Sequence, residues 1–206
     1  MKLRTLFLCF LSFFAIARTQ SFGPKIAFTH VTIIDATGAP AKPDMTVILS
    51  AGRIAEIGSS TQLRAPTDSQ VIDATGKFLI PGLWDMHVHW GNTAYLPLFI
   101  ANGVTGMRIM WGDSVQHEWR RQSETGQLLA PHLVIASALV DGPKPFWPGS
   151  VSVSTESQAR QAVAQAKQAG ADFVKVYTFL PREEYFAMVD EAKKQDIPFA
   201  GVAVAE

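Results

Sequence analysis

Two histidines one residue apart, His87 and His89 in LWDMHVHW, have the spacing of a possible metal site. In a β-strand the side chains alternate between faces, so Asp85, His87 and His89 would share one face. Imidazole nitrogen suits zinc and other divalent transition metals. Such a pair also occurs on ordinary half-exposed strands. Here His89 is expected near the C-terminal end of its strand, where parallel α/β folds gather their functional residues, and this favours a metal site.

A lysine, Lys175, lies within the otherwise apolar run DFVKVY. In a strand, Phe173, Lys175 and Tyr177 would share one face, while Val174 and Val176 would face covering helices. A buried ammonium is costly, so it must lose its charge, pair with a carboxylate or be modified. The neutral amine could form a Schiff base or, with carbon dioxide, a carbamate. Alternatively, the lysine extends from the strand end into solvent.

Residues 22–80 have the pattern of short strands joined by turns. The β-branched run KIAFTHVTIID is followed by the turn-rich ATGAPAKPD, and further turns are expected at Ala51-Gly52 and Thr75-Gly76. No helical period occurs in this stretch. The sequence therefore predicts a small all-β unit before residue 81.

Residues 81–206 alternate between strands and helices. Strands are expected in LWDMHVHW, VTGMRIMW, PHLVIASALV and DFVKVYTF, and a fifth begins in IPFAGVAVAE. The clearest helix has Ser154 or Thr155 as its N-cap and Gly170 at its end. This spacing is typical of parallel βα units, which fit both a doubly wound sheet and a barrel. The absence of a Gly-x-Gly-x-x-Gly motif removes support for a dinucleotide-binding fold.

The first 17 residues have the pattern of a signal peptide. Lys2 and Arg4 precede the apolar run TLFLCFLSFFAIA, which is short for a membrane span. Small residues at positions 15 and 17 predict cleavage after Ala17, with an uncleaved anchor as the alternative. We therefore expect export to the periplasm or the medium, without a stable membrane anchor after cleavage.

Cleavage would also remove Cys9, the only cysteine. Any metal would then be held by nitrogen and oxygen, because the mature chain has no thiolate and no disulfide. The full chain has 18 basic and 18 acidic residues, and loss of Lys2 and Arg4 leaves a charge of −2. This balance gives no indication of a nucleic-acid partner or an anionic membrane surface.

From about residue 26 onward, the chain resembles the amidohydrolase superfamily, and within it a secreted branch similar to imidazolonepropionases and Xaa-Pro dipeptidases. The matching segments are VTIIDATG, VILSAGRIAEIG, VIDATGKFLIPGLWDMHVHW, ANGVTGMRIMWGD, LVDGPKPFWPGS and AGADFVKVY. The resemblance implies an α/β fold. A small β-sandwich segment, residues 22–80, would precede a partial (β/α)8 TIM-like barrel, residues 81–206, of about four and a half βα units.

The resemblance also implies roles for particular residues. His87 and His89 would end the first barrel strand and bind the more buried metal. Lys175 matches a fourth-strand lysine that is carboxylated in many members and bridges two metals. One or two divalent ions, zinc by default, would activate water for attack on an amide or ester carbon. Arg108 matches a common second-strand residue, for which a structural ion pair is the simplest interpretation.

The C-terminal end departs from the family pattern. Val202 stands where a fifth-strand histidine is expected, and the later histidine and the aspartate that accepts the proton from water have no counterpart. No catalytic residue is therefore identified. A complete barrel needs roughly 200 residues or more, so residues 81–206 correspond to a part of one. We interpret the chain as a truncated or frame-shifted product, or as one half of a split protein.

Three hypotheses follow from the sequence. The first is a metal-dependent amidohydrolase that cleaves a C–N bond in a small-molecule or dipeptide-like substrate. The second is a catalytically inactive fragment or metal-binding remnant of such an enzyme. The third is Schiff-base chemistry by Lys175 on a doubly wound fold. Five aromatic residues could line the mouth of a site, although packing is the simpler interpretation: Trp84, Trp90, Trp111, Phe146 and Trp147. The oligomeric state cannot be predicted.

Overall fold

A computed structural model describes residues 23–89 and 91–201 of the chain. The expected signal peptide, Trp90 and Val202 lie outside the described residues. The chain forms two compact units, Met1–Pro81 and Gly82–Glu206. Among the described residues, none of the helices has the length and apolar character needed to cross a membrane.

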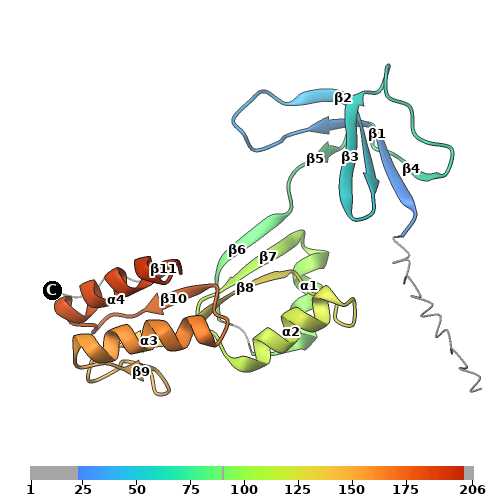
Figure 1. The fold of residues 1–206 in the computed structure, drawn as a ribbon. Coiled ribbons are helices and arrows are strands. Elements are labelled where there is room, and N and C mark those ends of the chain that lie inside the picture. Colours follow the sequence, from blue (N-terminus) through green and yellow to red (C-terminus); the bar gives the residue numbers. More distant parts are fainter. Residues whose placement is uncertain (1–22, 90, 202–206) are drawn as a thin grey trace, which may run out of the picture. The chain divides into compact units, whose positions relative to one another are not determined.

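The first unit is built from five strands (Figure 1). They are β1 (Lys25–Ile33), β2 (Lys42–Ser50), β3 (Arg53–Ser59), β4 (Ser69–Asp73) and β5 (Phe78–Leu79). Their order is β3-β2-β1-β4, and β5 also pairs with β1. The predicted turn at Ala51-Gly52 joins β2 to β3, and both residues have positive φ, at 52° and 71°. Such turns match the twist of an antiparallel hairpin.

The second unit contains five main strands and four α-helices within the described residues. The strands are β6 (Leu83–Val88), β7 (Val104–Ile109), β8 (His132–Asp141), β10 (Phe173–Val176) and β11 (Phe199–Gly201). The helices are α1 (Leu96–Ala101), preceded by the 3-10 turn η1 (Thr93–Tyr95), α2 (Ser114–Glu124), α3 (Glu156–Gln168) and α4 (Arg182–Lys194). A short strand, β9 (Val151–Ser152), pairs with β8.

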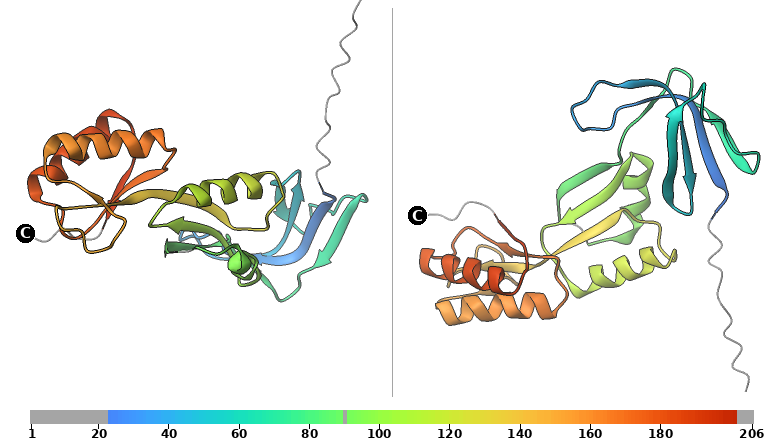
Figure 2. Two further views of the ribbon diagram at one scale, coloured as in Figure 1. Left: turned by 90° about the horizontal axis from the view of Figure 1, so that it is seen from below. Right: turned by 45° about the horizontal axis from the view of Figure 1, so that its top comes forward.

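The order of these strands distinguishes between the two predicted folds. The sheet runs β11-β10-β8-β7-β6, and every neighbouring pair among these five is parallel. Each successive strand of the chain is thus added at the same edge of the sheet. In a doubly wound sheet, by contrast, the order of the strands reverses at a switch point. Right-handed crossovers then place the helices on one face. Figure 2 shows α2 and α3 on the same side of β8 in a curled sheet. The prediction of a partial TIM-like barrel is confirmed.

Local sequence signals fix the ends of the helices. Asp113 caps α2 in a capping box, in which the Gln116 side chain accepts a hydrogen bond from the Asp113 N–H. Thr155, one of the two predicted residues, is the N-cap of α3, and its hydroxyl accepts from the Gln158 N–H at 3.2 Å. After α3, Gly170 has a φ of +81°, as predicted for a glycine that ends a helix.

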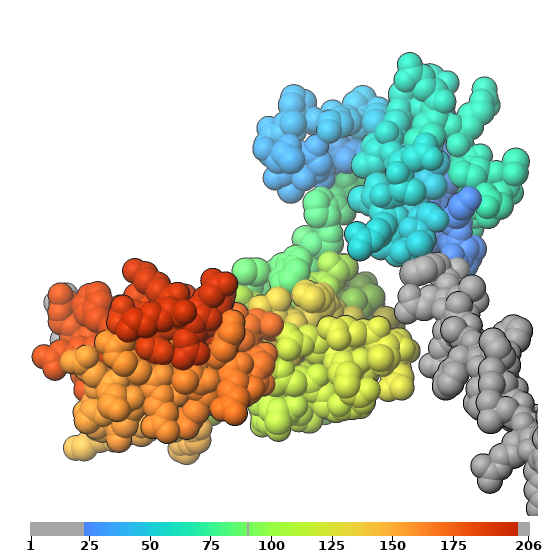
Figure 3. Space-filling view, viewed as in Figure 1, coloured from blue at the N-terminus to red at the C-terminus, as the bar shows by residue number. Residues whose placement is uncertain are grey.

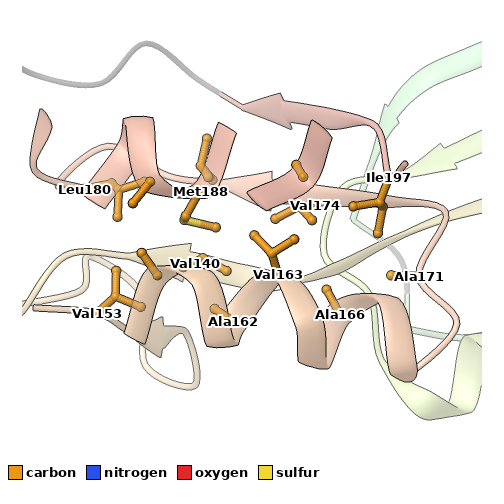
Figure 4. Packing of buried hydrophobic residues seen from close by; sticks show 14 residues of the cluster. Val140, Val153, Ala162, Val163, Ala166, Ala171, Val174, Leu180, Met188 and Ile197 are labelled. Atoms are coloured by element: carbon orange, nitrogen blue, oxygen red, sulfur yellow. The ribbon is translucent and has the colours of Figure 1, made fainter. Parts of the chain in front are cut away.

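Small apolar side chains join α3 and α4 to the sheet. The predicted outward orientation of Val174 and Val176 is confirmed, because both are buried with Val163 of α3 and Met188 of α4 (Figure 4). Figure 3 shows α3 and α4 packed directly against one another. Because α3 and α4 cover one face of β10, the opposite face, which carries Lys175, points toward the concave side of the sheet.

Two loops at the C-terminal ends of β8 and β10 share one buried anchor. Asp141 is completely buried, and its carboxylate accepts hydrogen bonds from the N–H groups of Gly142, Phe146 and Phe179 at 2.9, 2.9 and 2.7 Å. At Gly142 the chain passes so close to the second loop that an added Cβ would lie 1.9 Å from the Phe179 carbonyl oxygen. The carboxylate therefore holds residues 142–146 and residue 179 as one structure.

We predict that Asp141→Ala lowers the free energy of unfolding of the second unit by about 2–4 kcal/mol, because three backbone donors lose a charged acceptor. Urea unfolding followed by tryptophan fluorescence measures this, since all five tryptophans lie at position 84 or later. The control is Asp190→Ala on α4, whose side chain is 52% exposed in its ion pair with Arg160 and whose loss should change the stability far less. Equal losses in the two variants would contradict the anchoring role.

Candidate metal centre

The two histidines of the predicted pair converge at the end of β6. The strand ends at Val88, and His89 follows it directly. The Nε2 atoms of His87 and His89 lie 3.1 Å apart, and their ring centroids are separated by 5.1 Å. Two nitrogens that bind one tetrahedral zinc ion at about 2.0–2.1 Å are about 3.4 Å apart. The imidazoles therefore need only a small adjustment to bind a common ion.

A bulge in β6 lies between Asp85 and Val88 and includes the first histidine of this pair. Asp85 pairs with Met107 and Val88 with Ile109, so three steps along β6 match two steps along β7. The common face predicted for Asp85, His87 and His89 is therefore interrupted after Asp85. The Asp85 carboxylate instead accepts a hydrogen bond from the His87 N–H at 3.2 Å. Strand bulges of this kind redirect side chains beside functional sites.

Arg108, from the neighbouring strand β7, stabilises the bulge. Its Nε donates to the carbonyl oxygen of Met86 at 2.9 Å, and its guanidinium lies 5.6 Å from the centre of the Phe173 ring. No described acidic residue forms a salt bridge with it, so the structure does not support the ion pair suggested for Arg108 by the sequence. Its contacts are to a backbone carbonyl and an aromatic face.

Lys175 lies on a strand whose four residues are all buried, and it is itself 1% exposed. A second register shift occurs beside it, because Phe173 pairs with Ala136 and Lys175 with Leu139. The Ser137 hydroxyl fills the gap: it accepts from the Lys175 N–H at 3.0 Å and donates to the Ala138 carbonyl at 2.7 Å. Sequence reasoning missed Ser137, since a serine within an apolar strand carries no signal of its own.

The surroundings of Lys175 favour its neutral form. Burial lowers the pKa of the ammonium, and the positive charge of Arg108 lowers it further. Within residues 23–89 and 91–201, no carboxylate forms a salt bridge with it. Of the three outcomes expected for a buried lysine, pairing with an acid is therefore not observed here, and the neutral or modified amine remains.

An electrostatic interaction connects Lys175 to the histidine pair. Burial lowers the pKa of His89, and positive charge on His87 and Lys175 lowers it further. Neutral imidazole is the form that binds metal ions. The part of the chain that is described contains no group of three or more His, Cys, Asp or Glu side chains placed to hold a metal ion. The donors that converge here are thus the two imidazole nitrogens of His87 and His89.

The remaining histidines lie in other surroundings. His30 contacts the Asp44 carboxylate at 2.7 Å in the first unit, and His117 lies 3.1 Å from Arg120 on α2. The His132 ring packs edge-on against Trp84 at 5.8 Å. These contacts give all three histidines structural or surface roles away from the His87–His89 pair.

The chain matches no protein-family model. It is similar in structure to a putative prolidase from Bifidobacterium longum, with 26% identity and a TM-score of 0.72 over 86% of this chain and 49% of that protein. A Xaa-Pro dipeptidase with bound methionine in its active site shares the fold, with a TM-score of 0.73, 21% identity and coverage of 86% and 56%.

In sequence, an N-substituted formamide deformylase from Arthrobacter pascens is 36% identical over 81 residues, which are 38% of this chain and 14% of that enzyme. The chain thus spans about half the length of the similar structures and a smaller part of this relative. These similarities confirm the predicted resemblance to the amidohydrolase superfamily, in the fold over most of the chain and in sequence over shorter segments.

Proposed function

We propose that His87, His89 and Lys175 bind one or two divalent metal ions, zinc in the first instance, and serve the hydrolysis of an amide or peptide-like C–N bond. The observation that carries this proposal is the 3.1 Å separation of the two Nε2 atoms at the end of the first strand of the parallel sheet. The buried position of Lys175 on a neighbouring part of the same sheet supports it. When bound, such a metal lowers the pKa of water and polarises a carbonyl group.

The chain's own residues would hold the ligands in place. The Arg108 guanidinium fixes the Met86 carbonyl in the bulge before His87, and Ser137 fixes the backbone of Lys175. Both contacts restrict the strands rather than the metal ligands directly. Because the strands are held in place, the three side chains that they carry have less conformational entropy to lose when they bind an ion.

Lys175 has the properties needed for carboxylation. In its neutral form the Nζ lone pair attacks the carbon of carbon dioxide, a new N–C bond forms, and Nζ loses a proton to solvent. The product is an anionic carbamate, which offers oxygen ligands in place of the amine nitrogen. Burial opposes the ammonium form, and the Arg108 charge both disfavours the ammonium and would stabilise the carbamate anion.

The names of similar proteins suggest the class of substrate. A prolidase and a Xaa-Pro dipeptidase share the fold, and a formamide deformylase shares sequence. A dipeptide-like or other small amide is therefore the proposed substrate. The general base is not identified, since no acidic side chain groups with both histidines among the described residues. This observation favours, as the second candidate, metal binding without turnover.

We also propose export, with residues 1–17 as a cleaved signal peptide. The charged start and short apolar run of the sequence support this. Expression of the full chain in a Gram-negative host should yield a periplasmic protein whose N-terminal sequence begins at Arg18. A cytoplasmic product that retains Met1 would contradict the proposal.

His87→Ala and His89→Ala should each weaken zinc binding by at least about tenfold, because each removes one nitrogen ligand. Competition of the purified full chain with a chromogenic chelator measures the affinity. The matched control is His30→Asn in the first unit, which also removes an imidazole and keeps a residue type tolerant of the positive φ of 57° there. Wild-type affinity in both site variants would exclude this pair as the metal ligands.

The zinc-loaded chain is expected to hydrolyse at least one compound in a panel of Xaa-Pro dipeptides and N-acyl amino acids. A chelator should abolish the rate and added zinc should restore it, while Lys175→Met should lower it by at least about tenfold. Product amine is measured by chromatography. Stoichiometric zinc without turnover on any member of the panel would select the second candidate instead.

A further inference from the structure

Four aromatic side chains gather at the C-terminal ends of β8 and β10, and we call them the aromatic patch: Phe146, Trp147, Tyr177 and Phe179. The Phe146 ring lies 5.1 Å from Trp147, 6.1 Å from Tyr177 and 6.2 Å from Phe179, measured between ring centroids. The Trp147 indole N–H donates to the Tyr177 hydroxyl oxygen at 3.0 Å. Phe146 is thus the centre of the cluster.

The aromatic patch begins beside the candidate metal centre. The Nζ of Lys175 lies 6.0 Å from the centre of the Tyr177 ring, and Tyr177 is two residues further along the chain from Lys175. The hydrogen bond from Trp147 fixes the far end of the same ring. A compound held at Lys175 would therefore have the aromatic patch as its immediate neighbour.

The backbone that carries the patch is anchored at one buried residue. The buried Asp141 carboxylate accepts from the N–H groups of both Phe146 and Phe179, so the two loops that carry the rings are tied to one point. Gly142 leaves no room between the loops for a larger residue. Apolar side chains on unrestrained loops would collapse to bury their surface. Here the anchored backbone fixes the positions of the two loops that carry the rings.

The rings remain accessible despite this close grouping. Phe146, Trp147 and Phe179 are 55%, 45% and 48% exposed. Phe179 also lines an open hollow of about 500 Å³ together with Pro143 and Lys144. That volume lies within the range of about 300–1,000 Å³ typical of small-molecule sites. Rigid, exposed aromatic surface beside such a hollow is suited to a planar apolar group.

We propose that the aromatic patch is a subsite for an apolar, preferably aromatic, group of the substrate, next to the C–N bond held at the metal centre. This inference rests on the proposed function for its location and adds the class of substrate. A small molecule, rather than a second copy of the chain, is the proposed occupant, because Tyr177 lies beside Lys175 and Phe179 lines a hollow of ligand size.

The test uses a matched pair of amides, phenylacetamide and acetamide, which differ in the phenyl group. Ligand-observed NMR titration of the full chain is done with a chelator present, so that no metal or turnover is required. Phenylacetamide should bind at least about tenfold more tightly than acetamide, because only its ring can be buried on the patch. Phe146→Ala and Trp147→Ala should each remove most of this difference.

The matched control is Phe186→Ala on α4. Phe186 is also an exposed aromatic residue, at 53%, and it packs against Tyr185 and Arg182 rather than the patch. This variant should keep the full preference for phenylacetamide. Equal affinity for both amides, or equal effects of all three substitutions, would overturn the proposal. A wild-type dimer that Trp147→Ala converts to a monomer in sedimentation would also overturn it, because the patch would then be a self-association surface.

The outcomes separate this inference from the proposed function. Preference for the aromatic amide in a chain that binds no zinc would support the subsite and reject the metal centre. Zinc binding and hydrolysis without that preference would support the proposed function and reject the subsite.

Discussion

The candidate centre depends on the burial of one amine. Lys175 lies in a strand of four buried residues, with helices packed on the opposite face, and it forms no salt bridge with a described acidic residue. A free ammonium there would reduce stability by several kcal/mol, so the fold favours the neutral amine at this position. An uncharged, solvent-shielded amine is a ligand, a nucleophile or a site of carboxylation, and a charged surface lysine is none of these. The small residues of α3 and α4 contribute indirectly, because they let the helices cover β10 closely enough to exclude water.

Two breaks in strand register occur beside the candidate ligands, and a polar side chain compensates for each. The first lies between Asp85 and Val88 and is held by Arg108, while the second lies opposite Phe173 and Lys175 and is held by Ser137. A regular ladder would satisfy the same backbone groups without these side chains. The breaks therefore have a consequence beyond hydrogen bonding: they change the directions of the side chains that follow. This provides a physical reason for two polar residues within an otherwise apolar sheet.

Much of this arrangement could be predicted from sequence. The βα alternation, the caps of α3 and the outward valines follow from local periodicity and helix-capping chemistry. The choice between a barrel and a doubly wound sheet could not be made from elements alone, since it depends on which strands become neighbours. The convergence of the two histidines was correctly predicted from the alternation of β6, but the register shift between Asp85 and Val88 was not, because a bulge has no signature in a single sequence. Ser137 and Asp141 were missed for a related reason, as each has a backbone partner 38 residues further along the chain.

Asp141 shows how the scaffold and the proposed recognition surface are connected. Asp141 is the last residue of β8, its carboxylate binds the loops after both β8 and β10, and these two strands pair directly. Because Asp141 ties both loops to one point, Lys175, Tyr177 and the aromatic residues of the loops keep fixed positions relative to one another. In a parallel sheet the C-terminal ends of adjacent strands meet at one edge, so a single buried anion there can align a reactive group with the surface that would orient its substrate. The geometry between amine and rings is thus set by the sheet register and does not depend on any one aromatic side chain.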